Sequence, residues 1–264
     1  MCPWFNSKRY HLRRLLNGSL FFSRELKGRA MDIQAIAYAR NGFTQKFGIP
    51  RQSRTDSALL TRIVFTPKYR VSEALRGIEG FSHLWLIWGF SKNESVENWS
   101  PTVRPPRLGG NVRMGVFATR SPFRPNPIGL TSVELIRVEE TPEDGLTLLV
   151  RGADLLDGTP IYDIKPYLSY TDAHPDAING FAEAPKDYRL QVEWSAQAEA
   201  GLHASGTESD AQNLKTALDE IFSQDPRPAY QDDPERRYGL EYNGVEAHFR
   251  VVQNKVLVMD VRKK

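Results

Sequence analysis

Short runs of apolar residues with the period of β-strands follow one another through the first two thirds of the chain. The run FSHLWLIWGF at 81–90 is almost continuously apolar and aromatic, which predicts a strand buried on both faces. Residues 72–81 predict a short helix instead, with Ser72 as its N-cap and Gly77 as its end. Further strands are predicted at 33–43, 59–69, 112–120, 128–140 and 146–155, the last two joined by a hairpin connection at TPEDG.

The pattern changes after residue 170. Residues 171–186 are rich in Asp, Pro, Ala and Gly, which is typical of a linker. Beyond it, residues 209–224 have a helical period, and Ser209 with Gln212 predicts a capping box. Strands are predicted at 188–195 and 255–262, and between them an Asn-Gly turn joins two more strand-like runs. The helix has one apolar face, made of Ala211, Leu214, Ala217, Leu218, Ile221 and Phe222.

These elements predict a mainly β protein. Many short strands at close spacing, with Pro and Gly turns between them, indicate a barrel or a sandwich followed by a small α+β unit. We expect a leader at 1–30, a β domain at 31–170, a linker at 171–186 and an α+β domain at 187–264.

Charge is spread unevenly along the chain. Residues 1–30 carry seven basic side chains and one acidic side chain, a net charge of +6. The formal net charge of the whole chain is +3, so the remaining residues carry −3. We interpret this segment as a disordered or mis-assigned leader, with Met31 as the start; a transit peptide is the alternative. The only cysteine, Cys2, lies in it, so a reducing, cytoplasmic location is expected. No apolar run is long enough to cross a membrane.

Several common sites have no counterpart in the sequence. No Gly-x-Gly-x-x-Gly follows a strand and no P-loop occurs, so neither a Rossmann nor a Walker nucleotide site is expected. The five histidines are scattered, so no metal site is expected, and nothing indicates a serine or cysteine hydrolase triad.

Three stretches rich in proline and polar residues remain, each at the end of a predicted strand: 101–111, 118–129 and 154–167. Between Asn98 and Val133 there are five arginines and no acidic residue. Proline stiffens such loops, and a rigid loop of arginines suits a polyanion because guanidinium groups bind phosphate oxygens in pairs. The alternative is a solvated basic loop without a ligand. Asp154 and Asp157 suit ribose hydroxyls or an ammonium group, and serve equally well as plain turn formers.

Taken together and in order, these stretches closely resemble the TrmO, or TsaA-like, family. The resemblance runs from about Ile36 to the C-terminus and leaves out residues 1–30. Its motifs are PRQ (50–52), GIEGFSHLWLI, RPPRLGG, GVFATRSPFRPNPIGL, DLLDGTPIYDIKPY and DPRPAY (225–230).

The resemblance implies a compact β-barrel, usually in a homodimer, that uses S-adenosylmethionine without a Rossmann fold. It implies methylation of N6 of N6-threonylcarbamoyladenosine, next to the anticodon of threonine tRNA, by in-line displacement at the sulfonium methyl. The acceptor nitrogen is a poor nucleophile, so we expect catalysis by positioning and exclusion of water, and the sequence assigns no catalytic base. A non-catalytic RNA-binding or S-adenosylmethionine-sensing module is the alternative.

The family's cofactor contacts carry over position by position. Where the family has His-Gln after the aromatic strand, this chain has Ser91-Lys92, so any contact made there by the side chains differs from the family's. Arg104, Arg107, Arg113 and Arg124 are expected to bind RNA phosphates. The expected cofactor contacts are Pro50, Arg51, Gln52, Ser91, Lys92, Arg120, Leu130, Asp154, Leu155, Leu156 and Asp157.

Overall fold

A computed structural model describes residues 32–49, 57–92, 99–105, 108, 110–182, 189–227 and 233–264. The predicted leader at 1–30 lies outside these residues. In the described part of the chain, no helix combines the length and the apolar character needed to cross a membrane. Most of the described elements are strands, so the mainly β prediction is confirmed.

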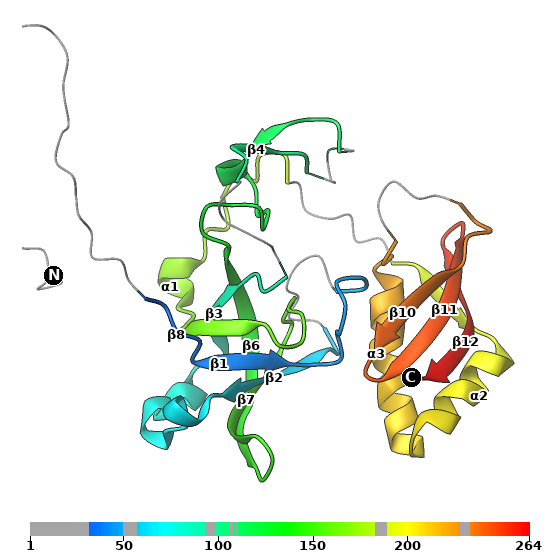
Figure 1. The fold of residues 1–264 in the computed structure, drawn as a ribbon, viewed down its shortest axis with the longest axis horizontal. Coiled ribbons are helices and arrows are strands. Elements are labelled where there is room, and N and C mark those ends of the chain that lie inside the picture. The colour runs from blue at the N-terminus through cyan, green and yellow to red at the C-terminus, as the bar shows by residue number, and fades with distance from the viewer. Residues whose placement is uncertain are drawn as a thin grey trace, which may run out of the picture. The chain divides into compact units, whose positions relative to one another are not determined.

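Six antiparallel strands pair in a closed ring, in the order β1-β2-β7-β6-β3-β8, with β8 returning to β1 (Figure 1). Long strand β6 makes this closure possible, because its first half pairs with β3 and its second half with β7. The predicted TPEDG hairpin joins β6 to β7, with Thr141 opposite Gly145. The strands of the ring are β1 (Ala37–Arg40), β2 (Leu60–Phe65), β3 (His83–Gly89), β6 (Ile128–Thr141), β7 (Gly145–Arg151) and β8 (Pro160–Pro166).

The aromatic strand β3 differs from its prediction. Leu84, Leu86 and Trp88 are buried inside the ring, whereas the residues between them are only half-buried. A closed ring has one inner face, so a strand in it alternates. The outer face of β3 is still apolar because it is partly covered: Trp85 contacts Tyr167 and donates a hydrogen bond of 2.8 Å to Asp172.

Two predictions of local structure between strands hold only in part: the predicted helix ends before Gly77 as expected, but it is a 3₁₀ turn whose N-cap is Val71 and not Ser72. Gly77, with φ 86°, separates this turn, η2 (Ser72–Leu75), from a second 3₁₀ turn, η3 (Ile78–Gly80). The predicted strand at 112–120 is strand only at β5 (Met114–Gly115), which pairs with β4 (Thr102–Val103). After it, the Thr119 hydroxyl bonds the Val116 carbonyl at 2.8 Å and stabilises a 3₁₀ turn, η6 (Val116–Ala118). A further 3₁₀ turn, η1 (Pro67–Tyr69), follows β2, and the short helix α1 (Ser169–Asp172) follows β8.

The C-terminal part folds into a four-stranded sheet in the order β10-β11-β12-β9, packed against helices α2 and α3 (Figure 1). All six predicted apolar residues of α3 are buried, which confirms that face of the helix. The predicted Asn243-Gly244 turn joins β10 to β11, with φ of 47° and 78°. The elements are β9 (Gln191–Trp194), α2 (Ala196–Ser205), α3 (Glu208–Ser223), β10 (Tyr238–Tyr242), β11 (Val245–Val252) and β12 (Lys255–Lys263).

Two details of the helices correct the sequence analysis. The capping box of α3 is formed by Thr207 and Asp210 rather than by Ser209 and Gln212. Helix α2 was not predicted, because its apolar residues are few and do not gather on one side; its N-cap is Ser195, which accepts from the Ala198 amide at 3.1 Å.

Candidate cofactor and RNA site

The arginine-rich turn before β6 is held in shape by its own side chains. The Arg124 guanidinium donates to the carbonyls of Thr119 (3.1 Å) and Ser121 (3.4 Å). The Thr119 hydroxyl accepts from the Ser121 amide at 3.3 Å, and the Ser121 hydroxyl accepts from the Phe123 amide at 3.2 Å. Arg124 therefore binds its own loop, a role that the sequence analysis did not foresee for a residue expected to bind phosphate.

Strand β6 then directs alternate side chains to opposite sides of the ring. Leu130 is 56% exposed, whereas the next residue, Thr131, is only 4% exposed. Inside the ring, the Thr131 hydroxyl donates to the Asp154 carboxylate at 2.8 Å and accepts from the Trp88 indole N–H at 2.9 Å. Neither Thr131 nor Trp88 was among the predicted site residues, because only the strand pairing reveals which residues point inward.

Asp154 is a half-buried carboxylate with a perturbed acidity. Burial raises the pKa of Asp154, while the hydrogen bond from Thr131 and the positive charge of Arg120 act in the opposite direction. Arg120 itself is exposed. The charge of one predicted cofactor contact, Arg120, thus lowers the pKa of another, Asp154, although the two side chains form no ion pair in the described part of the chain.

The second aspartate of the DLLD segment has a different environment. Asp157 accepts a hydrogen bond of 3.0 Å from the Asn41 amide and lies 3.5 Å from the Arg40 guanidinium, so it fixes the end of β1. Leu155 and Leu156, between the two aspartates, are buried. The Asp157 side chain therefore ties the DLLD segment to the end of β1, whereas the Asp154 side chain bonds Thr131 inside the ring.

The predicted contacts after the aromatic strand lie beside the arginine-rich turn. The Phe90 amide donates to the Pro127 carbonyl at 2.9 Å, which ties the end of β3 to the end of that turn. Ser91 and Lys92 follow and are exposed. The structure thus brings the end of β3, the turn before β6 and Asp154 together, while Pro50, Arg51, Gln52 and Arg107 lie outside the described residues.

The other predicted RNA contacts, Arg104 and Arg113, are exposed. No ion pair within the described ranges involves Arg104, Arg113, Arg120 or Arg124. The positive charge of this region is therefore not neutralised by the part of the protein that the structure describes, as its sequence suggested.

Large apolar side chains are exposed beside these arginines, a feature that the sequence analysis missed. Phe117 is 73% exposed and Phe123 is 63% exposed, and Leu130 follows them on β6. Trp99 contacts Phe117, with ring centroids 6.1 Å apart. Exposed apolar residues in a group mark a surface that another molecule covers.

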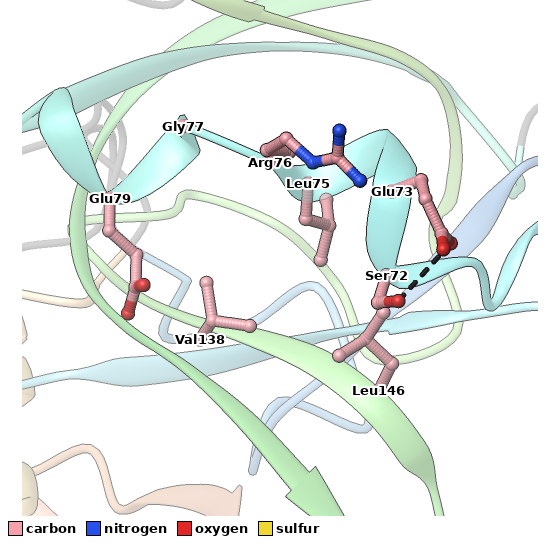
Figure 2. A pocket seen from close by; sticks show the side chains of 8 residues that line it. All are labelled: Ser72, Glu73, Leu75, Arg76, Gly77, Glu79, Val138 and Leu146. Atoms are coloured by element: carbon pink, nitrogen blue, oxygen red, sulfur yellow. Dashed lines mark hydrogen bonds between the residues drawn. The ribbon is translucent and has the colours of Figure 1, made fainter.

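A pocket elsewhere on the ring does not include any of the predicted site residues. It has a volume of about 340 Å³ and lies between the two 3₁₀ turns and the residues Val138 and Leu146 (Figure 2). Glu73, Arg76 and Glu79 give it mixed charge, and the Ser72 hydroxyl bonds Glu73 at 3.2 Å. The candidate site is the open surface at the end of the ring and not this pocket.

Two family models match the chain. The model described as the tRNA-methyltransferase O N-terminal domain matches residues 38–173, and the model of the TrmO C-terminal domain matches residues 187–264. The first range contains the ring and the candidate site, and the second contains the four-stranded sheet with its two helices.

Curated proteins and solved structures agree with these matches. An Escherichia coli (strain K12) protein named tRNA (adenine(37)-N6)-methyltransferase is 39% identical over 84% of this chain and 94% of its own length. A Pseudomonas aeruginosa protein named putative S-adenosylmethionine-dependent methyltransferase RcsF is 42% identical over 87% of this chain and 96% of its own. A crystal structure of TrmO superposes with a TM-score of 0.71 at 36% identity, over 88% of this chain and 99% of that chain. TrmO from Pseudomonas aeruginosa gives 0.70 at 35% identity, over 88% and 98%.

Proposed function

This chain belongs to the TrmO family, and we propose that it is an S-adenosylmethionine-dependent tRNA methyltransferase. Its substrate is N6-threonylcarbamoyladenosine next to the anticodon of threonine tRNA, and the methyl group goes to N6. The observation that carries the proposal is the chain of hydrogen bonds that holds the Asp154 carboxylate at the end of the ring, close to exposed arginines that form no ion pair among the described residues. The relatives' names support the same reaction class.

The described residues fit the cofactor. S-adenosylmethionine supplies, when bound, a methyl group activated by its sulfonium charge. Asp154 offers a carboxylate with one oxygen held by Thr131, which suits ribose hydroxyls or an ammonium group. Arg120 is an exposed guanidinium that suits a carboxylate. In this proposal these two side chains orient the cofactor, and the reaction depends on positioning more than on proton removal.

The arginines that follow β4 and precede β5 supply affinity for RNA. Arg104 and Arg113 are exposed, and contacts with phosphates fix the position of an RNA without reading its bases. Arg124 keeps its positive charge while it holds the turn, so it contributes to the field rather than by a direct contact of its bonded N–H groups.

We further propose a homodimer in the cytoplasm. The exposed apolar side chains Phe117, Phe123 and Leu130 support a covered surface at this end of the ring. In the same proposal the ring is the compact β-barrel domain at 31–170, a linker spans 171–186, and the α+β domain spans 187–264. The matched ranges of the two family models support this division.

Nucleoside mass spectrometry of tRNA from a strain without this gene tests the proposal. We expect the N6-methylated threonylcarbamoyl nucleoside to disappear and its unmethylated precursor to accumulate. An unchanged level of the methylated nucleoside would falsify the proposed reaction. Calorimetric binding of S-adenosylmethionine without methyl transfer to any tRNA would favour the alternative, a non-catalytic RNA-binding or cofactor-sensing module.

A further inference from the structure

The start of β6 and the end of β3 fit together through one glycine. Gly129 stands directly opposite Trp88 in the strand pairing, and a Cβ atom at this position would collide with the indole ring. The backbone of β6 therefore approaches the Trp88 indole more closely than any residue with a Cβ atom at position 129 would allow. The indole N–H group is then directed at the hydroxyl of Thr131, two residues along β6 from Gly129.

The chain of hydrogen bonds that follows has a fixed direction. An indole N–H can only donate, so the Thr131 oxygen accepts at 2.9 Å and its own proton is available for the Asp154 carboxylate at 2.8 Å. Trp88 and Thr131 are both buried, so bulk water does not compete for these hydrogen bonds. Rotation of the Thr131 side chain about its Cα–Cβ bond would break both hydrogen bonds and leave the buried indole N–H unsatisfied.

We propose that Thr131 and Trp88 are positioning residues that hold the Asp154 carboxylate toward the cofactor. Neither side chain touches the cofactor in this proposal; both act through Asp154. The inference rests on the proposed function, since it takes Asp154 as a cofactor contact. It adds that the geometry of this contact is set by two buried residues on neighbouring strands and by the glycine that seats one of them.

A buried threonine can also have a purely structural role, in which its hydroxyl only completes the hydrogen bonds of neighbouring groups. The ring contains a second buried threonine that serves as a control for this role. Thr147 on β7 is fully buried in the same ring, and its hydroxyl donates to the Glu139 carbonyl at 3.3 Å. Thr147→Val removes a buried hydroxyl from the ring without touching Asp154. Thr131→Val removes the donor to Asp154 at nearly constant shape, and Thr131→Ser keeps it.

The first measurement is the affinity of the full-length variants for S-adenosylhomocysteine by calorimetry. Thr131→Val is expected to weaken binding roughly tenfold, as for the loss of one hydrogen bond to a charged group. Thr131→Ser is expected to bind within about twofold of the unchanged protein, and Thr147→Val likewise. Equal weakening by Thr131→Val and Thr147→Val, or no weakening by either, overturns the proposal.

The second measurement needs no ligand and does not depend on the proposed function. Because the hydrogen bond from Thr131 lowers the pKa of Asp154, its loss should raise that pKa further, while Arg120, the charged side chain that acts on Asp154, stays in place. Carboxyl-selective NMR titration should therefore show a higher Asp154 pKa in Thr131→Val than in Thr131→Ser.

The two measurements separate the two failures. An unchanged Asp154 pKa in Thr131→Val refutes the positioning role, whatever the protein binds. A shifted pKa in a protein that binds no S-adenosylhomocysteine refutes the cofactor site and with it the purpose of the positioning. If Thr131→Val fails to fold, Trp88→Phe removes the donor behind Thr131, and it must likewise shift the Asp154 pKa for the proposal to stand.

Discussion

The arginine-rich surface at the end of the ring and the C-terminal sheet both carry exposed arginines, but they differ in whether these arginines form ion pairs. In the sheet, basic residues have acidic partners: Arg250 lies 3.5 Å from Glu235, and Arg262 pairs with Asp260. At the end of the ring, Arg104, Arg113 and Arg120 form no ion pair within the described ranges, and the charge of Arg120 acts on Asp154 only from beyond ion-pair distance. Exposed pairs contribute little to stability, but they cancel the local field; unpaired arginines keep it. Pairing, and not composition, distinguishes a solvated surface from one that binds a polyanion.

The largest effect is expected at Arg120. Arg120→Ala should lower kcat/KM for tRNA methylation by roughly 100-fold, because a charge-assisted contact to the cofactor is lost. Arg262→Ala, which removes an exposed but paired arginine, should change it by less than about twofold. Methylation of a tRNA transcript carrying the modified adenosine measures both. Equal losses in Arg120→Ala and Arg113→Ala would make Arg120 part of the general basic surface and nothing more.

Two half-buried aspartates sharpen the comparison. Burial raises the pKa of Asp154 in the ring and of Asp219 in α3, which accepts from the Trp194 indole at 2.6 Å. When the pKa of a carboxyl group is higher in the folded state than in the unfolded state, the unfolded state loses the proton first as the pH rises. The free energy of unfolding therefore falls between the ordinary aspartate pKa and the raised value. Asp154→Asn and Asp219→Asn should therefore both raise Tm at pH 7, with the gain vanishing in acid.

Only one of these two variants should affect the cofactor. Asp154→Asn is expected to weaken S-adenosylhomocysteine binding roughly tenfold, and Asp219→Asn to leave it unchanged. Calorimetry at pH 7 together with thermal unfolding at pH 4 and pH 7 gives both quantities. Full binding by Asp154→Asn would remove this carboxylate from the cofactor site.

The exposed phenylalanines test the proposed homodimer. Phe123→Ser should raise the dimer dissociation constant about fivefold, as for the loss of roughly 1 kcal/mol of apolar burial. Ile178→Ser is the matched control, since Ile178 is 97% exposed and lies outside this surface. Sedimentation equilibrium measures the constants, and identical values for the two variants would exclude Phe123 from a dimer interface.

The smallest effect is expected for RNA contacts that only position the substrate. The double variant Arg104→Ala/Arg113→Ala should bind tRNA about threefold more weakly at moderate salt, and its log-log salt slope should fall by roughly 1.5. The double variant Arg250→Ala/Arg262→Ala, from the paired charges of the sheet, should keep the original slope. Filter binding at several salt concentrations compares them, and equal slopes in all proteins would remove Arg104 and Arg113 from the RNA interface.

The spacing of apolar residues was sufficient to predict most strands and helix α3, because an element buried on one face has apolar residues at the period of that element. It did not locate the capping box, since Thr207-x-x-Asp210 and Ser209-x-x-Gln212 fit the same signature and only the helix start decides between them. It also missed Thr131 and Trp88. Their importance depends on β3 and β6 being neighbours, and residues more than 40 positions apart meet only after the ring has closed.

The loop that Arg124 ties to itself has a consequence for the speed of recognition. A turn already fixed by two carbonyl bonds does not have to fold around an arriving RNA, so encounter and not rearrangement should limit association. Arriving RNA would meet a preformed positive surface, and added salt should slow association more than it speeds dissociation. A variant that loosens this turn should therefore show a lower association rate constant for RNA before any other change.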